Sequence, residues 1–144
     1  MTLADKETRP RPLPATSLDT APFWAGAKEN KLMLQSDAAA ADGAGAYQFS
    51  PRPVSIHTGR ADLEWREASG KGKLFAHTVC YIPARGFEDV APYVLAAVDL
   101  EEGVRIVARL VDVTPEEVEP GMALRVCWDR LSDDINYFAF ERDG

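Results

Sequence analysis

The chain has 144 residues, 46% of them apolar, so it can bury one modest core or one core with a small appended module. Its formal net charge of −7 disfavours a nucleic-acid partner, because binding phosphates requires clustered Lys and Arg. No apolar run approaches the roughly 18 residues that span a bilayer, and the first residues lack the apolar segment of a signal peptide. The only cysteines, Cys80 and Cys127, do not form the dense disulfide framework of a small secreted protein, and we expect a cytoplasmic protein.

Residues 1–18 are polar and contain Pro10, Pro12 and Pro14 among charged residues, so they cannot form a core of their own. Two interpretations remain open for this segment. It could be a disordered tail, or it could be an extended arm that becomes ordered on a partner, since proline lowers the entropy lost on docking.

Residues 20–34 predict a short amphipathic helix and the segment that leaves it. Thr20 is a suitable N-cap, and Pro22 fits the first turn, where its missing N–H is not needed. Asn30 can end the helix in a left-handed conformation. Phe23 and Trp24 on this helix either pack on the chain's own sheet or face a partner, because interfaces favour aromatic side chains.

Residues 35–65 have the layout of a zinc ribbon without its ligands. A ribbon that holds zinc with four thiolates needs two Cys-x-x-Cys pairs. Two pairs of positions with this spacing are present, Ala41/Ala44 and Ser55/Thr58, and each is followed by a glycine. None of the four carries a thiol, and one neighbouring imidazole, His57, cannot hold a structural zinc. We therefore expect a metal-free remnant of a zinc ribbon.

A structural zinc contributes roughly 10 kcal/mol or more to folding, so something must replace it if the ribbon is ordered. One possibility is a partner subunit that holds the segment in place. The other is a small apolar cluster within the chain, formed by Tyr47, Phe49, Val54, Ile56, Leu63 and Trp65.

Residues 66–142 predict a five-stranded barrel. Strands are expected at 74–81, 93–100, 104–113, 124–128 and 137–140, with a short N-capped helical turn at 114–118 after the third strand. This order of elements is that of an OB-fold. The predicted fold is mainly β: a tail at 1–18, then a helix with a degenerate rubredoxin-like zinc ribbon at 19–65, then an OB-fold domain at 66–144.

Short motifs spread along the chain carry a family resemblance. They are TAPFWAG at 20–26, DLEW at 62–65, GKG at 70–72, GFED at 86–89 with PY at 92–93, and GM at 121–122. In this order they resemble the acyl-CoA-associated zinc-ribbon/OB-fold proteins, small subunits that accompany thiolases and related enzymes. Typical members have cysteines where this chain has Ala41, Ala44, Ser55 and Thr58. The departure concerns metal binding, and the resemblance still implies the fold.

The resemblance implies a non-catalytic accessory subunit of a thiolase-type, or thiolase-like aldolase or hydratase, acyl-CoA enzyme. Such a subunit would stabilise its partner and help to shape the acyl-CoA site. Its helix and ribbon would form much of the partner contact, through Phe23, Trp24, Tyr47 and Phe49. The alternative is a free-standing acyl-CoA carrier or regulatory protein.

The residues themselves do not indicate an enzyme. His77 and Cys80 lie three apart in a predicted strand and so point to opposite faces, which leaves Cys80 without a base. A buried free thiol is the simpler interpretation of Cys80 and of Cys127. Single-stranded nucleic acid, a common OB-fold ligand, would need a basic groove that this acidic chain lacks.

No cofactor is expected on this chain alone, but a CoA thioester could lie where it meets its partner. The cations closest to the family motifs are Arg52, Lys71, Lys73 and Arg85, and these are the candidate contacts for CoA phosphates. The alternative interpretation is that they are ordinary solubilising charges.

Overall fold

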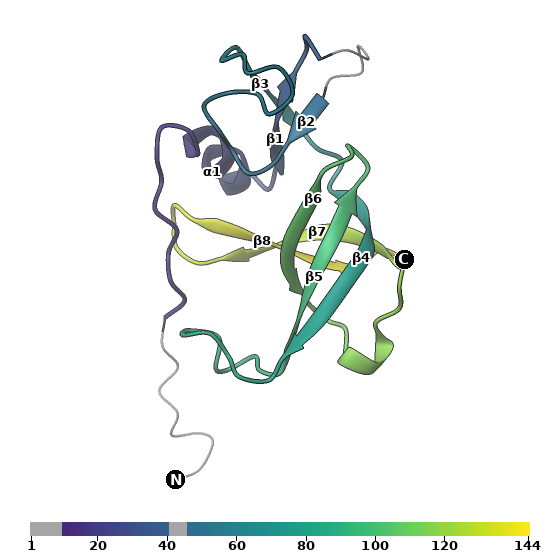
Figure 1. The fold of residues 1–144 in the computed structure, drawn as a ribbon. Coiled ribbons are helices and arrows are strands. Elements are labelled where there is room, and N and C mark those ends of the chain that lie inside the picture. The colour runs from purple at the N-terminus through teal and green to yellow at the C-terminus, as the bar shows by residue number, and fades with distance from the viewer. Residues whose placement is uncertain (1–9, 41–45) are drawn as a thin grey trace.

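The structure is a computed structural model that describes residues 10–40 and 46–144. Helix α1 (Ala21–Lys28) precedes a small sheet of β1 (Met33–Asp37), β2 (Ala46–Gln48) and β3 (Glu64–Glu67), in the order β2-β1-β3. A closed barrel with the strand order β4-β5-β6-β8-β7 follows. Its strands are β4 (Lys71–Cys80), β5 (Tyr93–Leu100), β6 (Arg105–Leu110), β7 (Ala123–Arg130) and β8 (Asn136–Arg142). The predicted five-stranded OB-fold with a preceding helix is confirmed (Figure 1).

Helix α1 begins and ends where the sequence predicts. Thr20 is the N-cap residue and Pro22 lies in the first turn, although the Thr20 hydroxyl accepts a hydrogen bond from Ser17 N (2.9 Å) and does not cap the helix. Asn30 adopts the predicted left-handed conformation, with φ of 62°. The amide Nδ2 of Asn136, on β8, donates to Ala27 O (2.8 Å) and to Asn30 Oδ1 (2.7 Å). The end of the helix is thereby fixed to the barrel.

The barrel is built from antiparallel neighbours and one parallel contact. The β5–β6 hairpin turns at Gly103, whose φ of 86° favours glycine. At Gly72, a Cβ atom would lie 2.6 Å from Asp99 O, so only glycine allows β4 to approach β5 this closely. The predicted helical turn is a 3-10 helix at Pro115–Glu117, with Thr114 and Glu117 forming a capping box. Strands β6 and β8 pair at a single position, Leu110 with Phe140.

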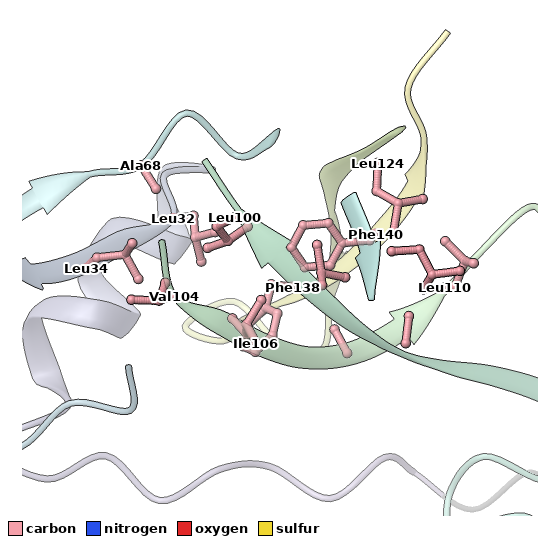
Figure 2. Packing of buried hydrophobic residues seen from close by; sticks show 14 of the residues in the cluster. Leu32, Leu34, Ala68, Leu100, Val104, Ile106, Leu110, Leu124, Phe138 and Phe140 are labelled. Carbon is pink, nitrogen blue, oxygen red and sulfur yellow. The ribbon is translucent and has the colours of Figure 1, made fainter. Parts of the chain in front are cut away.

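One hydrophobic cluster joins the helix, the small sheet and the barrel. Phe23 from α1 and Leu32 and Leu34 from the segment beside it belong to the same buried cluster as the barrel residues. Figure 2 shows Leu32, Leu34 and Ala68 at one end of this cluster and Leu110 and Leu124 at the other. The helix and ribbon therefore share the core of the barrel. Within the described part of the chain, no helix is long and apolar enough to cross a membrane.

The described part of the N-terminal segment lies against the chain's own barrel. Arg11 Nη1 donates to Gly86 O (2.6 Å) and to Asp89 Oδ1 (3.1 Å), in the loop between β4 and β5. At Gly86 a Cβ atom would lie 2.8 Å from Pro10 O, so the two segments approach closely. Residues 10–18, called the N-terminal arm below, thus dock in cis. The other half of the predicted tail, residues 1–9, lies outside the described residues.

Candidate functional site

The second pair of positions that the sequence matched to zinc ligands, Ser55 and Thr58, is held by a carboxylate. Thr58 Oγ1 donates a hydrogen bond of 2.6 Å to Asp37 Oδ2, and the Ser55 hydroxyl also bonds to this carboxylate. Asp37 Oδ1 accepts from Ala39 N at 2.9 Å. Asp37 ends strand β1 and is only 2% exposed. The first pair, Ala41 and Ala44, lies outside the described residues.

Further hydrogen bonds close the turn that begins at Ser55. Ser55 Oγ accepts from His57 N (3.0 Å) and Thr58 N (3.2 Å), so the hydroxyl ties down the turn that follows it. The hydrogen bonds from Ser55 and Thr58 lower the pKa of Asp37. The carboxylate is therefore stabilised in its ionised form, and its hydrogen bonds are charge-assisted.

A second polar layer fixes the loop between β2 and β3. Gln48 Nε2 donates to Gln35 Oε1 (2.8 Å), and both amide side chains are buried. Gln35 Nε2 donates to Arg52 O, and Arg52 N donates to Gln35 Oε1, each over 2.8 Å. Gln48 Oε1 accepts from Ile56 N at 2.8 Å. The side-chain amides of the two glutamines therefore bond to the backbone of this loop and fix its conformation.

The apolar cluster expected to replace the zinc is only partly present. Val54 and Ile56 are 43% and 58% exposed, so the prediction is wrong for these two residues. Tyr47, Phe49 and Trp65 are partly buried, but they pack against the core shared with the barrel. The ribbon interior is polar because the backbone of the 49–60 loop needs hydrogen-bond partners, which alkyl side chains cannot supply. Among the residues that the structure describes, no group of three or more His, Cys, Asp or Glu could hold a metal.

The four aromatic residues predicted for a partner interface differ in exposure. Phe23 is 3% exposed, and its ring meets that of Phe138 edge-on, with 5.8 Å between centroids. This residue belongs to the chain's own core. Trp24, Tyr47 and Phe49 are each partly exposed, and Trp24 packs against Tyr137 at 5.7 Å between centroids.

Both cysteines are free thiols in partly buried positions. Burial raises the pKa of Cys127 to about 11, so this thiol stays protonated near neutral pH and is a poor nucleophile. His77 is exposed on β4.

The four cations predicted for CoA phosphates do not gather in one place. Lys71 and Lys73 are two residues apart at the start of β4 and share a face of the strand, and both are exposed. Arg85 follows the other end of β4, about 30 Å away for a strand of this length. Arg52 lies in the ribbon loop. A single phosphate group cannot meet all four.

Several site residues could not be identified by motif. Asp37 was hidden in an Ala-rich stretch, and its pairing with Thr58 spans 21 positions. No sequence motif marks Gln35 and Gln48 either. The one usable signal was that each is a polar residue within a short β-rich run, which can indicate a buried hydrogen-bond network. Arg11 sat in a segment expected to lie off the barrel.

Comparison with known proteins gives a consistent result. The C-terminal OB-fold domain of ChsH2 matches residues 65–129. A DUF35 domain-containing scaffold protein of Pyrococcus furiosus is 38% identical over 96 residues, which are 67% of this chain and 66% of the relative. A probable enoyl-CoA hydratase alpha subunit of Thermomonospora curvata is 35% identical over 131 residues, 90% of this chain. This chain spans only 39% of that hydratase subunit.

A solved structure extends the likeness to the whole fold. The structure described as an Ltp2-ChsH2(DUF35) aldolase contains a chain that superposes with a TM-score of 0.77 at 28% identity. The match covers 90% of this chain and 98% of the other. The likeness therefore includes the helix and ribbon as well as the barrel.

Replacing Asp37 with asparagine should destabilise the ribbon, because the amide keeps the size but removes the charge and one acceptor. We expect Asp37→Asn to lower the Tm by roughly 3–6 °C at neutral pH, measured by thermal unfolding. Since folding lowers the pKa of Asp37, its contribution is complete above the ordinary carboxyl pKa and is lost as the pH falls through the lower folded value. The Tm difference from wild type should therefore narrow below about pH 4. The exposed Asp134→Asn is the matched control, and equal Tm values for the two variants would contradict the role of Asp37.

Proposed function

Because the chain belongs to the family of DUF35 scaffold proteins and ChsH2-type OB-fold subunits, we propose that it is a non-catalytic accessory subunit of a thiolase-like acyl-CoA enzyme. The observation that carries the proposal is the likeness to the DUF35 chain of the aldolase, which extends over 98% of that chain. The relatives named as hydratase alpha subunits support a CoA thioester as the substrate class. The partner would supply the nucleophile and the acid and base groups.

The state of the titratable side chains supports a non-catalytic role. Burial keeps the Cys127 thiol protonated. Cys80 is partly buried, and the histidine nearest to it in sequence, His77, is exposed on the same strand. A nucleic-acid ligand is disfavoured by the net charge of −7. The barrel aromatics do not decide the matter, because Tyr93 and Phe138 are buried whereas Phe75 and Tyr81 are exposed.

The ribbon loop is the surface we assign to the partner. The loop exposes Val54 and Ile56 beside the partly exposed Tyr47 and Phe49. The two buried glutamines fix the backbone of this loop, so its apolar side chains are presented by a rigid support. Pre-organised apolar side chains favour binding because little entropy is lost when they dock. Trp24 extends this surface onto helix α1.

Of the four candidate cations, Lys71 and Lys73 are the best placed for a CoA phosphate. They lie together at the start of β4, which follows strand β3 of the ribbon after a short connection. Lys73 forms no ion pair with any described residue, and Lys71 has only a 4.0 Å contact with Asp143. Both ammonium groups are therefore available to an anion.

The first test is purification of the tagged chain from native cell lysate, with mass identification of the proteins that accompany it. We expect a thiolase-like enzyme in stoichiometric amount, because the apolar ribbon loop should be covered in the complex. A variant with Val54→Asp and Ile56→Asp should lose this partner and keep its fold by circular dichroism. A wild-type chain that elutes as a lone soluble monomer would contradict the proposal and favour the free-standing carrier.

We propose that the ribbon folds without zinc, since Ser55 and Thr58 bond to Asp37 in place of a metal. Metal analysis of the purified chain should find well below one zinc per chain. Adding EDTA should leave the Tm unchanged, whereas chelators denature domains that depend on zinc for folding. Stoichiometric zinc, or a fall in Tm with EDTA, would show that other residues bind the metal.

Charge reversal tests the two lysines. Lys71→Glu with Lys73→Glu should raise the KM of the assembled enzyme for acyl-CoA by about tenfold, with kcat little changed, because the lost contacts lie away from the reacting atoms. The effect should shrink as ionic strength rises. Arg85→Glu, at the other end of β4, provides the comparison. If the double variant and Arg85→Glu have the same KM, the lysines do not contact the coenzyme.

A further inference from the structure

The barrel has a cavity of about 310 Å³ at the place where β6 and β8 separate. These strands pair only at Leu110 and Phe140, and the parts that precede the pair diverge. Ala108 from β6 and Phe138 from β8 reach the cavity from the two sides of this gap. Leu95, Val107 and Arg109 alternate along their strands with core residues such as Ala96 and Ala108, so the cavity lies mainly on the outer face of β5 and β6. We call it the seam cavity.

The seam cavity has apolar walls and a roof that comes from a distant part of the sequence. Its apolar lining includes Leu95, Val107, Leu131, Ala139, Phe87 and Tyr93. Arg11 and Pro12 of the N-terminal arm close one side. The Arg11 guanidinium lies over the Phe87 ring, 4.7 Å from its centroid, and its contacts with the β4–β5 loop fix the arm there. The N-terminal arm, the β4–β5 loop and strands β5, β6, β7 and β8 all contribute to the lining of the cavity.

The charged groups at the seam cavity neutralise one another. Arg11 forms ion pairs with Asp89 (3.1 Å) and Asp129 (3.4 Å), and Arg109 forms one with Asp129 (3.5 Å). Two cations therefore meet two carboxylates, and neither sign is left in excess. An anionic ligand would have to displace a carboxylate, whereas an uncharged apolar ligand would leave all three pairs intact.

We propose that the seam cavity binds the acyl end of a CoA thioester, as an uncharged chain of about eight to ten carbons. At roughly 30 Å³ for each water-sized group, the cavity has space for about ten such groups. Its volume is at the lower end of the range for small-molecule sites, which are mostly apolar and concave. The inference rests on the proposed function for the identity of the ligand. It differs from the proposed role of Lys71 and Lys73, which concerns the phosphate end.

The test is calorimetric titration of the full chain with acyl-pantetheines, which carry the thioester but not the phosphates of CoA. Affinity should rise about fourfold for each added methylene from butanoyl to octanoyl, as expected for burial of a methylene group. The rise should stop near ten carbons, where the cavity is full. Pantetheine without an acyl group should not bind. Absence of saturable octanoyl-pantetheine binding at millimolar concentration, or affinity independent of chain length, would overturn the proposal.

Substitutions that fill the cavity locate the binding. Val107→Trp, at the exposed mouth of the cavity, should weaken octanoyl-pantetheine binding at least tenfold. Ile82→Trp is the matched control, because Ile82 is 91% exposed and does not line the cavity. Leu95→Trp, on the neighbouring strand, is a second variant in case the first indole turns towards solvent. If both filling variants fold and bind as tightly as the control, the acyl chain binds elsewhere.

The outcome is separable from that of the proposed function. Acyl-pantetheine binding needs no partner enzyme, so it can succeed even where no thiolase-like protein accompanies the chain. Conversely, the chain could co-purify with a thiolase-like enzyme and yet show no acyl-pantetheine binding. That result would support the accessory role and contradict only the acyl site.

Discussion

The contact between helix α1 and strand β8 is the constraint on which the rest of the structure depends. Phe23 packs against Phe49 of the ribbon loop and Phe138 of the barrel, with 5.8 Å between its ring centroid and each of theirs, and these two rings also meet each other at 6.1 Å. Edge-on and tilted aromatic pairs of this kind add to the free energy gained by burial. Asn136 bonds to the end of the helix beside them. One aromatic joint therefore sets the positions of helix, ribbon and barrel together, and neither half has a separate core.

Hydrogen bonds to buried polar side chains organise the loops of the ribbon in this structure. A zinc ion organises loops by drawing four ligands to one point. Here an ionised carboxylate accepts several hydrogen bonds, and a pair of amide side chains acts similarly on the next loop. Each such bond is weak beside a metal–thiolate bond, but the shared aromatic core lowers the stability that the ribbon must supply itself. The hydrogen bonds and the shared core together therefore fix the ribbon loops.

The sequence was a good guide to the elements and a poor guide to the site. The barrel strands followed from β-rich runs separated by glycine and proline turns, and Thr20, Pro22 and Asn30 marked the helix correctly because capping is local chemistry. Asp37, Gln35 and Arg11 were not identified, since their roles depend on side-chain and loop partners 13 or more positions away. The Val54 and Ile56 prediction failed for a related reason. Hydrophobicity predicts burial, but it cannot show that a loop's backbone needs polar partners.

The place of β8 in the barrel also constrains how the chain folds during synthesis. Residues 136–142 pair with β7 and touch β6, and Asn136 bonds to a helix 109 positions earlier. On a ribosome, helix α1 and the barrel strands β4 to β7 emerge before β8, the strand that contacts both the helix and the barrel. Until then the ring of Phe23 lacks one of its aromatic neighbours, and β7 has an unpaired edge. Folding of the barrel therefore requires residues 136–142, and a nascent chain that still lacks them exposes apolar surfaces that the folded chain buries in its single core.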